Sequence, residues 1–180
     1  MKNFIKNNFY LLSICIFIYG CGAKEQASSD NQATKDITSI EVDLEQQNEE
    51  ARKSMIDLMN SYVNSVKELN AEKVINHYLK STEFKFITDG QILGYDETVK
   101  NAHDFVENIT QVEGGWDTIY VSVLHPDIVA AMAPFHETFT DKEGNKIPLK
   151  GEITWIAVKN EGNWKFAYGH GFHQPDDGNK

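Results

Sequence analysis

The sequence predicts an α+β domain, and two features of its patterning carry that prediction. Through the first half of the domain, apolar residues recur every three or four positions, as they do on one face of a helix. After Gly114-Gly115 they alternate at every second position, which is typical of strands, and turn sequences such as DKEGNK separate the alternating runs. Helices followed by hairpin-linked strands indicate helices gathered on one face of an antiparallel sheet.

Three helices are expected in the first half. The first spans 45–69, where the apolar positions are Ala51, Met55, Leu58, Met59, Tyr62, Val66 and Leu69. Asn70 is a suitable cap for the second, AEKVINHYLK, which carries Glu72 in its first turn. The third begins near Asp96, and its buried positions are expected to be Val99, Ala102, Phe105, Val106 and Ile109.

The predicted strands begin with the short segment FKFIT, which a glycine-containing turn follows. Gly114-Gly115 is interpreted as a break between the helical half and the strands. The long strands then follow in order at TIYVSVL, 128–140, 147–159 and 163–175. Tight turns at HPD, DKEGNK and NEGN join them, which indicates a meander of hairpins.

The last strand, NWKFAYGHGFHQP, has an unusual division between its two sets of alternate residues. One set is aromatic, with a histidine among its members: Trp164, Phe166, Tyr168, His170 and Phe172. The other set holds Gly169 and Gly171 and is nearly bare. Strict alternation places the two sets on opposite faces of the sheet. The aromatic set is expected to face the interior, since aromatic side chains are usually buried, and the bare set to face outward. Trp164, Phe166 and Phe172 are then expected to be core residues.

The N-terminus has the order of a bacterial lipoprotein signal. Lys2 and Lys6 precede a short apolar run, which is too short to span a membrane. The run ends Ile18-Tyr19-Gly20-Cys21, which resembles a lipobox, although Tyr19 departs from the usual residue type. The resemblance implies cleavage before Cys21 and lipidation of that residue. An uncleaved anchor helix and an ordinary secretory signal are the alternatives.

These features divide the chain into four segments. Residues 1–20 are expected to be the signal peptide, and 21–44 the lipidated cysteine and a disordered polar tether. Residues 45–174 form the folded domain, and 175–180 a disordered tail. The predicted location is the bacterial cell envelope, with the protein anchored to the membrane by lipid.

Net charge and cysteine content argue against nucleic-acid binding and against a disulfide. The chain has a net charge of -10, and loss of residues 1–20 would bring the net charge to about -12. Such acidity argues against nucleic-acid binding, which needs a basic surface, and leaves lipid as the only expected contact with the membrane. The processed chain would keep one cysteine, so no intramolecular disulfide is expected.

Residues 48–173 resemble the nuclear transport factor 2-like superfamily, and within it the SnoaL-like and ketosteroid isomerase-like proteins. The resemblance rests on Asn70-Ala71-Glu72, on DGQILGYDET and on the ending EGNWKFAYGH, in this order. It implies a cone-shaped fold, in which a curved antiparallel sheet wraps around about three N-terminal helices and a pocket opens at one end. It also implies a possible homodimer through the outer face of the sheet.

Within that cone, six residues are candidates for lining the pocket. They are His170, Tyr168, Tyr78, Tyr95, Trp155 and His136. A buried histidine or tyrosine needs a hydrogen-bond partner, which a bound molecule can supply. The alternative for His170 is a structural histidine whose bonds are satisfied within the protein. His77 on the second helix is another candidate for the pocket wall.

The sequence offers no metal or cofactor motif. His170 and His173 fall on opposite faces of a strand, and there is no Cys/His cluster, no phosphate-binding loop and no dinucleotide fingerprint. We therefore expect neither a metal nor a cofactor.

No catalytic base can be assigned from the sequence. Glu83, Glu137 and Glu152 are the acids considered. Glu137 or Glu152 could be a pocket acid, but each of the three is interpreted most simply as an exposed residue. The sequence favours binding of a small apolar or aromatic molecule over catalysis. The alternatives are a lyase or isomerase that uses His170 with an unidentified acid, and an interaction module without an active pocket.

Overall fold

The structure is a computed structural model that describes residues 30–175, with side chains from 41 to 174. The expected signal peptide, Cys21, the first part of the tether and the tail after 175 lie outside the described residues. The chain divides into two compact units, Met1–Ile37 and Thr38–Lys180. Of the first unit, only the start of a helix is described. The second unit holds the sheet and the candidate site.

The helices are α1 (Asp30–Lys67), α2 (Ala71–Ile75) and α3 (Tyr95–Asn108). Residues 30–44, predicted to be a disordered tether, are therefore helical. A segment without an apolar period can still form a polar helix. Hydrogen bonds between side chains four residues apart, such as that from Gln47 to Asp43, stabilise a helix of this kind. The second helix is shorter than predicted, and its start is capped as expected, since the Asn70 side chain accepts a bond from the Lys73 N–H.

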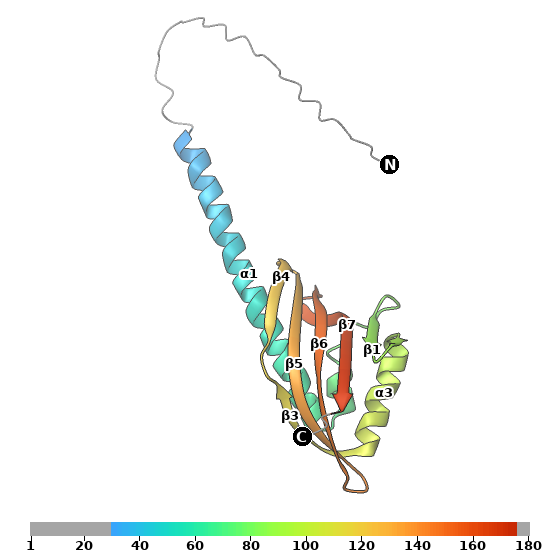
Figure 1. Cartoon of the computed structure of the whole chain (residues 1–180). Coiled ribbons are helices and arrows are strands. Elements are labelled where there is room, and N and C mark those ends of the chain that lie inside the picture. Colours follow the sequence, from blue (N-terminus) through green and yellow to red (C-terminus); the bar gives the residue numbers. More distant parts are fainter. Residues whose placement is uncertain (1–29, 176–180) are drawn as a thin grey trace, which may run out of the picture. The chain divides into compact units, whose positions relative to one another are not determined.

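The strands form one mixed sheet (Figure 1). They are β1 (Lys85–Thr88), β2 (Gln91–Leu93), β3 (Ile109–Trp116), β4 (Tyr120–His125), β5 (Ile128–Asp141), β6 (Lys146–Asn160) and β7 (Asn163–Pro175). The order is β2-β1-β7-β6-β5-β3, and β4 also pairs with β5. All pairs are antiparallel as predicted, except that β1 runs parallel to β7. The predicted α+β class is confirmed.

Two glycines that suggested a break lie inside a strand. Gly114 and Gly115 both belong to β3 and have positive φ angles of 96° and 139°. A Cβ atom on Gly114 would lie 2.0 Å from the carbonyl oxygen of His136 on the neighbouring strand. Glycine is therefore needed here for a close approach of two backbones. Ile109, predicted on the buried face of the third helix, begins this strand instead.

The core lies between α1 and the inner face of the sheet. Met55 and Met59 of α1 are fully buried, in one cluster with Val129 of β5 and Trp155 of β6. The indole of Trp155 stacks between the rings of Phe86 and Phe166, with centroids 4.9 and 4.5 Å away. This stack fixes β1, β6 and β7 around one aromatic centre.

A β-bulge in β7 reverses the predicted facing of its second half. Ile156 pairs with Tyr168 and Ala157 pairs with Phe166, so that Ala167 is an extra residue. An extra residue moves every later side chain to the opposite face. Phe166 is fully buried, as predicted, and Trp164 packs against the core.

Beyond the bulge, the expected inward facing of three residues is wrong. Tyr168 and Phe172 are 39% and 47% exposed, and His170 is exposed as well. The bare face is the inner one, because a Cβ atom on Gly169 would lie 2.3 Å from the Trp155 ring. Glycine is therefore required at 169 by the indole packed on it.

Candidate functional site

A cavity of about 280 Å³ opens between the inner face of the sheet and the helices. Its walls come from α1, α2, α3 and the strands β1, β2, β3, β5, β6 and β7. Aromatic rings form much of the surface: Tyr62, Phe86, Phe105, Trp116, Phe135 and Phe139. The polar lining residues are few. Besides Thr88, Thr98 and Asn101, they form three sets that differ in chemistry.

The first set is a pair of tyrosines. Tyr62 of α1 and Tyr78, which forms a β-bridge to Phe166, have their hydroxyl oxygens 3.1 Å apart. Burial raises the pKa of Tyr62 to about 12 and that of Tyr78 well above 10, so both are neutral. One hydroxyl hydrogen makes the bond between them. The second hydrogen needs another acceptor, which a ligand oxygen in the cavity can provide.

The second set is the carboxyl group of Glu137. Alternation along β5 brings Phe135, Glu137 and Phe139 to one face, and all three line the cavity. Burial among these rings raises the pKa of Glu137 from 4.5 to about 7, although Lys67 opposes the shift. Within the described part of the chain, no side chain or backbone N–H donates a hydrogen bond to this carboxyl group. It is a titrating group without an internal partner.

The third set is His173 of β7 with Asp89. The Asp89 carboxylate accepts two bonds from His173, one from the backbone N–H and one from Nδ1–H, both 2.9 Å long. Desolvation opposes ionisation of Asp89, but the bonds from His173 outweigh it and hold the pKa of Asp89 below its usual value. With Nδ1–H donated to Asp89, Nε2 is an acceptor when the ring is neutral.

Local geometry explains why Asp89 reaches His173. Asp89 and Gly90 have φ angles of 48° and 81° and form the tight turn between β1 and β2. An Asp-Gly pair suits such a two-residue hairpin. The parallel pairing of β1 with β7 then places this turn beside the end of β7. The turn sequence was visible in the chain, but the parallel pairing was not.

The structure brings only one of the six predicted pocket residues, Tyr78, into the cavity. His170 and Tyr168 lie on the outer face because of the bulge. Trp155 is fully buried in the core. His136 is exposed and pairs with Asp117 at 2.7 Å. Tyr95 packs edge-on against Phe84 beside a separate surface depression.

One of the three acids considered lines the cavity. Glu137 lines it, whereas Glu83 and Glu152 are exposed. The sequence did show Glu137 alternating with two phenylalanines, and that was the signal for its inward facing. His173 was missed because strict alternation from Trp164 placed it on the outer face. Among the residues with described side chains, no group of three or more metal-binding residues is found.

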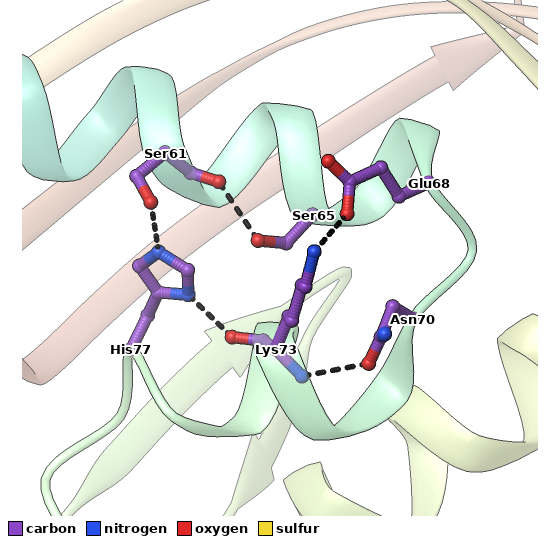
Figure 2. A network of polar contacts seen from close by, with 6 residues as sticks. All are labelled: Ser61, Ser65, Glu68, Asn70, Lys73 and His77. Carbon is purple, nitrogen blue, oxygen red and sulfur yellow. Dashed lines mark hydrogen bonds and ion pairs between the residues drawn. The ribbon is translucent and has the colours of Figure 1, made fainter.

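His77 belongs to a different network, between α1 and the segment after α2 (Figure 2). Its Nδ1–H donates to the carbonyl oxygen of Lys73 at 2.7 Å, and its Nε2 accepts from the hydroxyl of Ser61 at 2.9 Å. Burial lowers the pKa of His77, which keeps the ring neutral. The ring therefore joins α2 to α1 and does not line the cavity, contrary to the expectation from sequence.

Family models find no match to this sequence, and a comparison with characterised proteins also finds none. Solved structures do match. A nuclear transport factor 2-like superfamily protein from Salmonella enterica is 14% identical with a TM-score of 0.63, over 71% of this chain and 92% of that one. The chain has the nuclear transport factor 2-like fold.

Two further structures extend the comparison. A hexachlorocyclohexane dehydrochlorinase of type 2 shares the nuclear transport factor 2-like fold with this chain at 15% identity and a TM-score of 0.62, covering 75% of this chain and 95% of that one. A protein from Caulobacter vibrioides with a cystatin-like fold is 19% identical, with a TM-score of 0.59 over 71% and 92% of the two chains. At these identities the likeness establishes the fold. In the part of the chain with described side chains, no helix is long and apolar enough to cross a membrane.

Proposed function

We propose that this domain binds a small, largely apolar molecule in the cavity between the sheet and its helices. The observation that supports this is the cavity itself: about 280 Å³, walled by aromatic rings, with a few convergent polar groups. Ligand sites usually measure about 300–1,000 Å³ and have this balance of apolar wall and sparse polar groups. A volume just below that range suits a small molecule with one or two rings.

Filling the cavity tests this proposal. Ala102 of α3 lines the cavity, so Ala102→Leu should reduce its volume and weaken binding of aromatic fragments such as 2-phenylethanol at least several-fold. Ala130 lies on the outer face of β5, so Ala130→Leu is the matched control. Affinities measured by ligand-observed NMR should fall in the first variant alone. Equal affinities in both variants would show that the fragments bind elsewhere.

A second candidate function is that of a lyase or isomerase that works by proton transfer. One observation favours it: the cavity holds a carboxyl group that titrates near neutrality, Glu137, and an imidazole acceptor, His173. This replaces His170, which lies on the outer face. Enolisable aryl ketones incubated in D₂O would then exchange α-hydrogens faster with the protein than without it, and Glu137→Gln would abolish the gain.

Two proposals concern the setting of the domain. Lipidation of Cys21 would hold the protein at a membrane of the bacterial cell envelope, on the strength of the lysine, apolar run and lipobox-like order of residues 1–21. Cys21→Ala should then lose incorporation of labelled fatty acid and leave the membrane fraction. Association of two chains through the outer face of the sheet is supported by its exposed Tyr168, Phe172 and Met132.

A further inference from the structure

The Glu137 carboxyl group is out of place in its surroundings. It lies in a wall made of the rings of Phe135, Phe139 and Trp116, and no hydrogen bond or ion pair from the described residues satisfies it. A carboxylate in an apolar site without a partner is unfavourable by several kcal/mol in general. Either a proton or a bound cation relieves that cost.

None of the described charged groups near Glu137 acts as a paired cation for its carboxylate. Lys67, at the end of α1, is near enough to influence the carboxyl group but makes no ion pair with it and does not line the cavity. His173, at the other end of the site, is already bonded to the Asp89 carboxylate. Tyr62 and Tyr78 are neutral. Among the lining residues there is therefore no lysine or arginine to neutralise Glu137.

The walls are suited to a cation as well. A ring face attracts a positive charge within about 6 Å of its centroid, and the attraction grows when water is excluded. Phe135, Phe139 and Trp116 lie on the strands next to Glu137, since Gly114 of β3 pairs with Glu137 two residues from Trp116. An ammonium group placed at the carboxylate would therefore have aromatic side chains of β3 and β5 among its neighbours.

We propose that the cavity is selective for an apolar molecule that carries a protonated amine, with its ammonium group paired to the carboxylate of Glu137 and its apolar body among the aromatic rings. This rests on the proposed binding function. The register of the sheet determines how far His173 lies from Glu137: it is two strands away and displaced by two residues. With ordinary strand spacings, their α-carbons lie about 12 Å apart. A one-ring amine fits between the two side chains.

Three probes of equal size separate this proposal from its competitors. 2-Phenylethylamine and 2-phenylethanol differ only in the polar group, a charged ammonium against a neutral hydroxyl, and acetophenone offers a carbonyl oxygen and no charge. At pH 8 we expect the amine to bind at least tenfold more tightly than the alcohol. Glu137→Gln should remove that preference. Glu152→Gln, on the exposed outer face of β6, is the matched control and should retain it.

The pH dependence gives a second, independent readout. The pKa of the empty site is about 7, so the amine must displace a proton from most molecules at pH 6 and from few at pH 8. Its affinity should rise about tenfold between pH 6 and pH 8, with release of about 0.9 proton at pH 6, measured by calorimetry in buffers of different ionisation enthalpy. A ligand that accepts a hydrogen bond from protonated Glu137 would show the opposite slope.

The outcomes distinguish the two levels of the proposal. Binding of the alcohol and acetophenone as tightly as the amine, or tighter binding at pH 6 than at pH 8, would overturn the amine selectivity and leave the binding function standing. Failure of all three probes to bind, or binding that Ala102→Leu does not affect, would overturn both. An amine preference that survives Glu137→Gln would assign the selectivity to some other group and refute the pairing with this carboxylate.

Discussion

Replacing Glu137 by glutamine should stabilise the protein, and more so at high pH. Glutamine keeps the shape of the side chain and cannot ionise. Burial raises the pKa of Glu137 from 4.5 to about 7. Below pH 4.5 the carboxyl group is protonated in the folded and unfolded chain alike, so its charge costs nothing. Between pH 4.5 and 7 the unfolded chain releases the proton and the folded one retains it, so the folded state becomes progressively less favourable.

The size of the effect follows from that interval. A pKa raised by about 2.5 corresponds to about 3 kcal/mol against the folded state once the pH exceeds 7. The group is partly exposed, which reduces the figure. We therefore expect Glu137→Gln to raise the free energy of unfolding above that of the native sequence, and this gain should be about 2 kcal/mol larger at pH 8 than at pH 5.

Urea unfolding at the two pH values measures this difference directly, since the midpoint and slope give the free energy of unfolding. The same comparison with Glu152→Gln should show no such change, because that carboxyl group is exposed on the outer face. If Glu137→Gln had the same effect at both pH values, the carboxyl group would not be desolvated. The site would then be open to water, and the argument for an unpartnered carboxylate would fail.

Three other predictions test the packing, an ionisable group and the outer face. Gly169→Ala should lower the free energy of unfolding by about 3 kcal/mol, because its Cβ would lie 2.3 Å from the Trp155 ring. Gly171→Ala, whose Cβ would have its nearest contact at 3.3 Å, should cost clearly less in the same urea titration. Burial lowers the pKa of His77, so stability should fall as the pH drops below 6.5, and this loss should shrink in His77→Gln; an unchanged acid limb would contradict it. Tyr168→Glu, on the exposed outer face, should shift sedimentation from dimer to monomer at micromolar concentration, and a native protein that is monomeric already would refute the interface.

Long strands were predictable because each is bounded by a turn whose chemistry is local. Asp141 to Asn145 closes the β5–β6 hairpin with two bonds from Asn145 to the Asp141 carboxylate, and this turn was visible in the sequence. β3 was not predictable in the same way, because Gly114 and Gly115 look identical whether they interrupt a strand or let two backbones approach. Only the neighbouring carbonyl of His136 distinguishes these cases.

The site was less predictable than the fold for one physical reason. Facing along a strand depends on an unbroken count, and a single extra residue, Ala167, reverses it. Nothing local marks this bulge, since Phe166-Ala167-Tyr168 reads as ordinary alternation. As a result, His170 lies on the outer face and His173, not His170, lines the cavity. Glu137 needed no such correction, because β5 keeps its register with β6 along its whole length.

The position of Glu137 in the cavity wall has no structural explanation among the described contacts. A leucine there would continue the apolar wall between Phe135 and Phe139 and would remove a cost of about 2 kcal/mol at neutral pH. The carboxyl group is therefore not required for folding, since it bonds to none of the described residues and stabilises no turn. A structural explanation accounts for Asp89, which fixes His173, and for His77, which joins two helices. No such explanation accounts for Glu137. A group that weakens the fold and faces a cavity is explained by what enters that cavity, so the function of the domain should be sought first among molecules that complement a carboxylate.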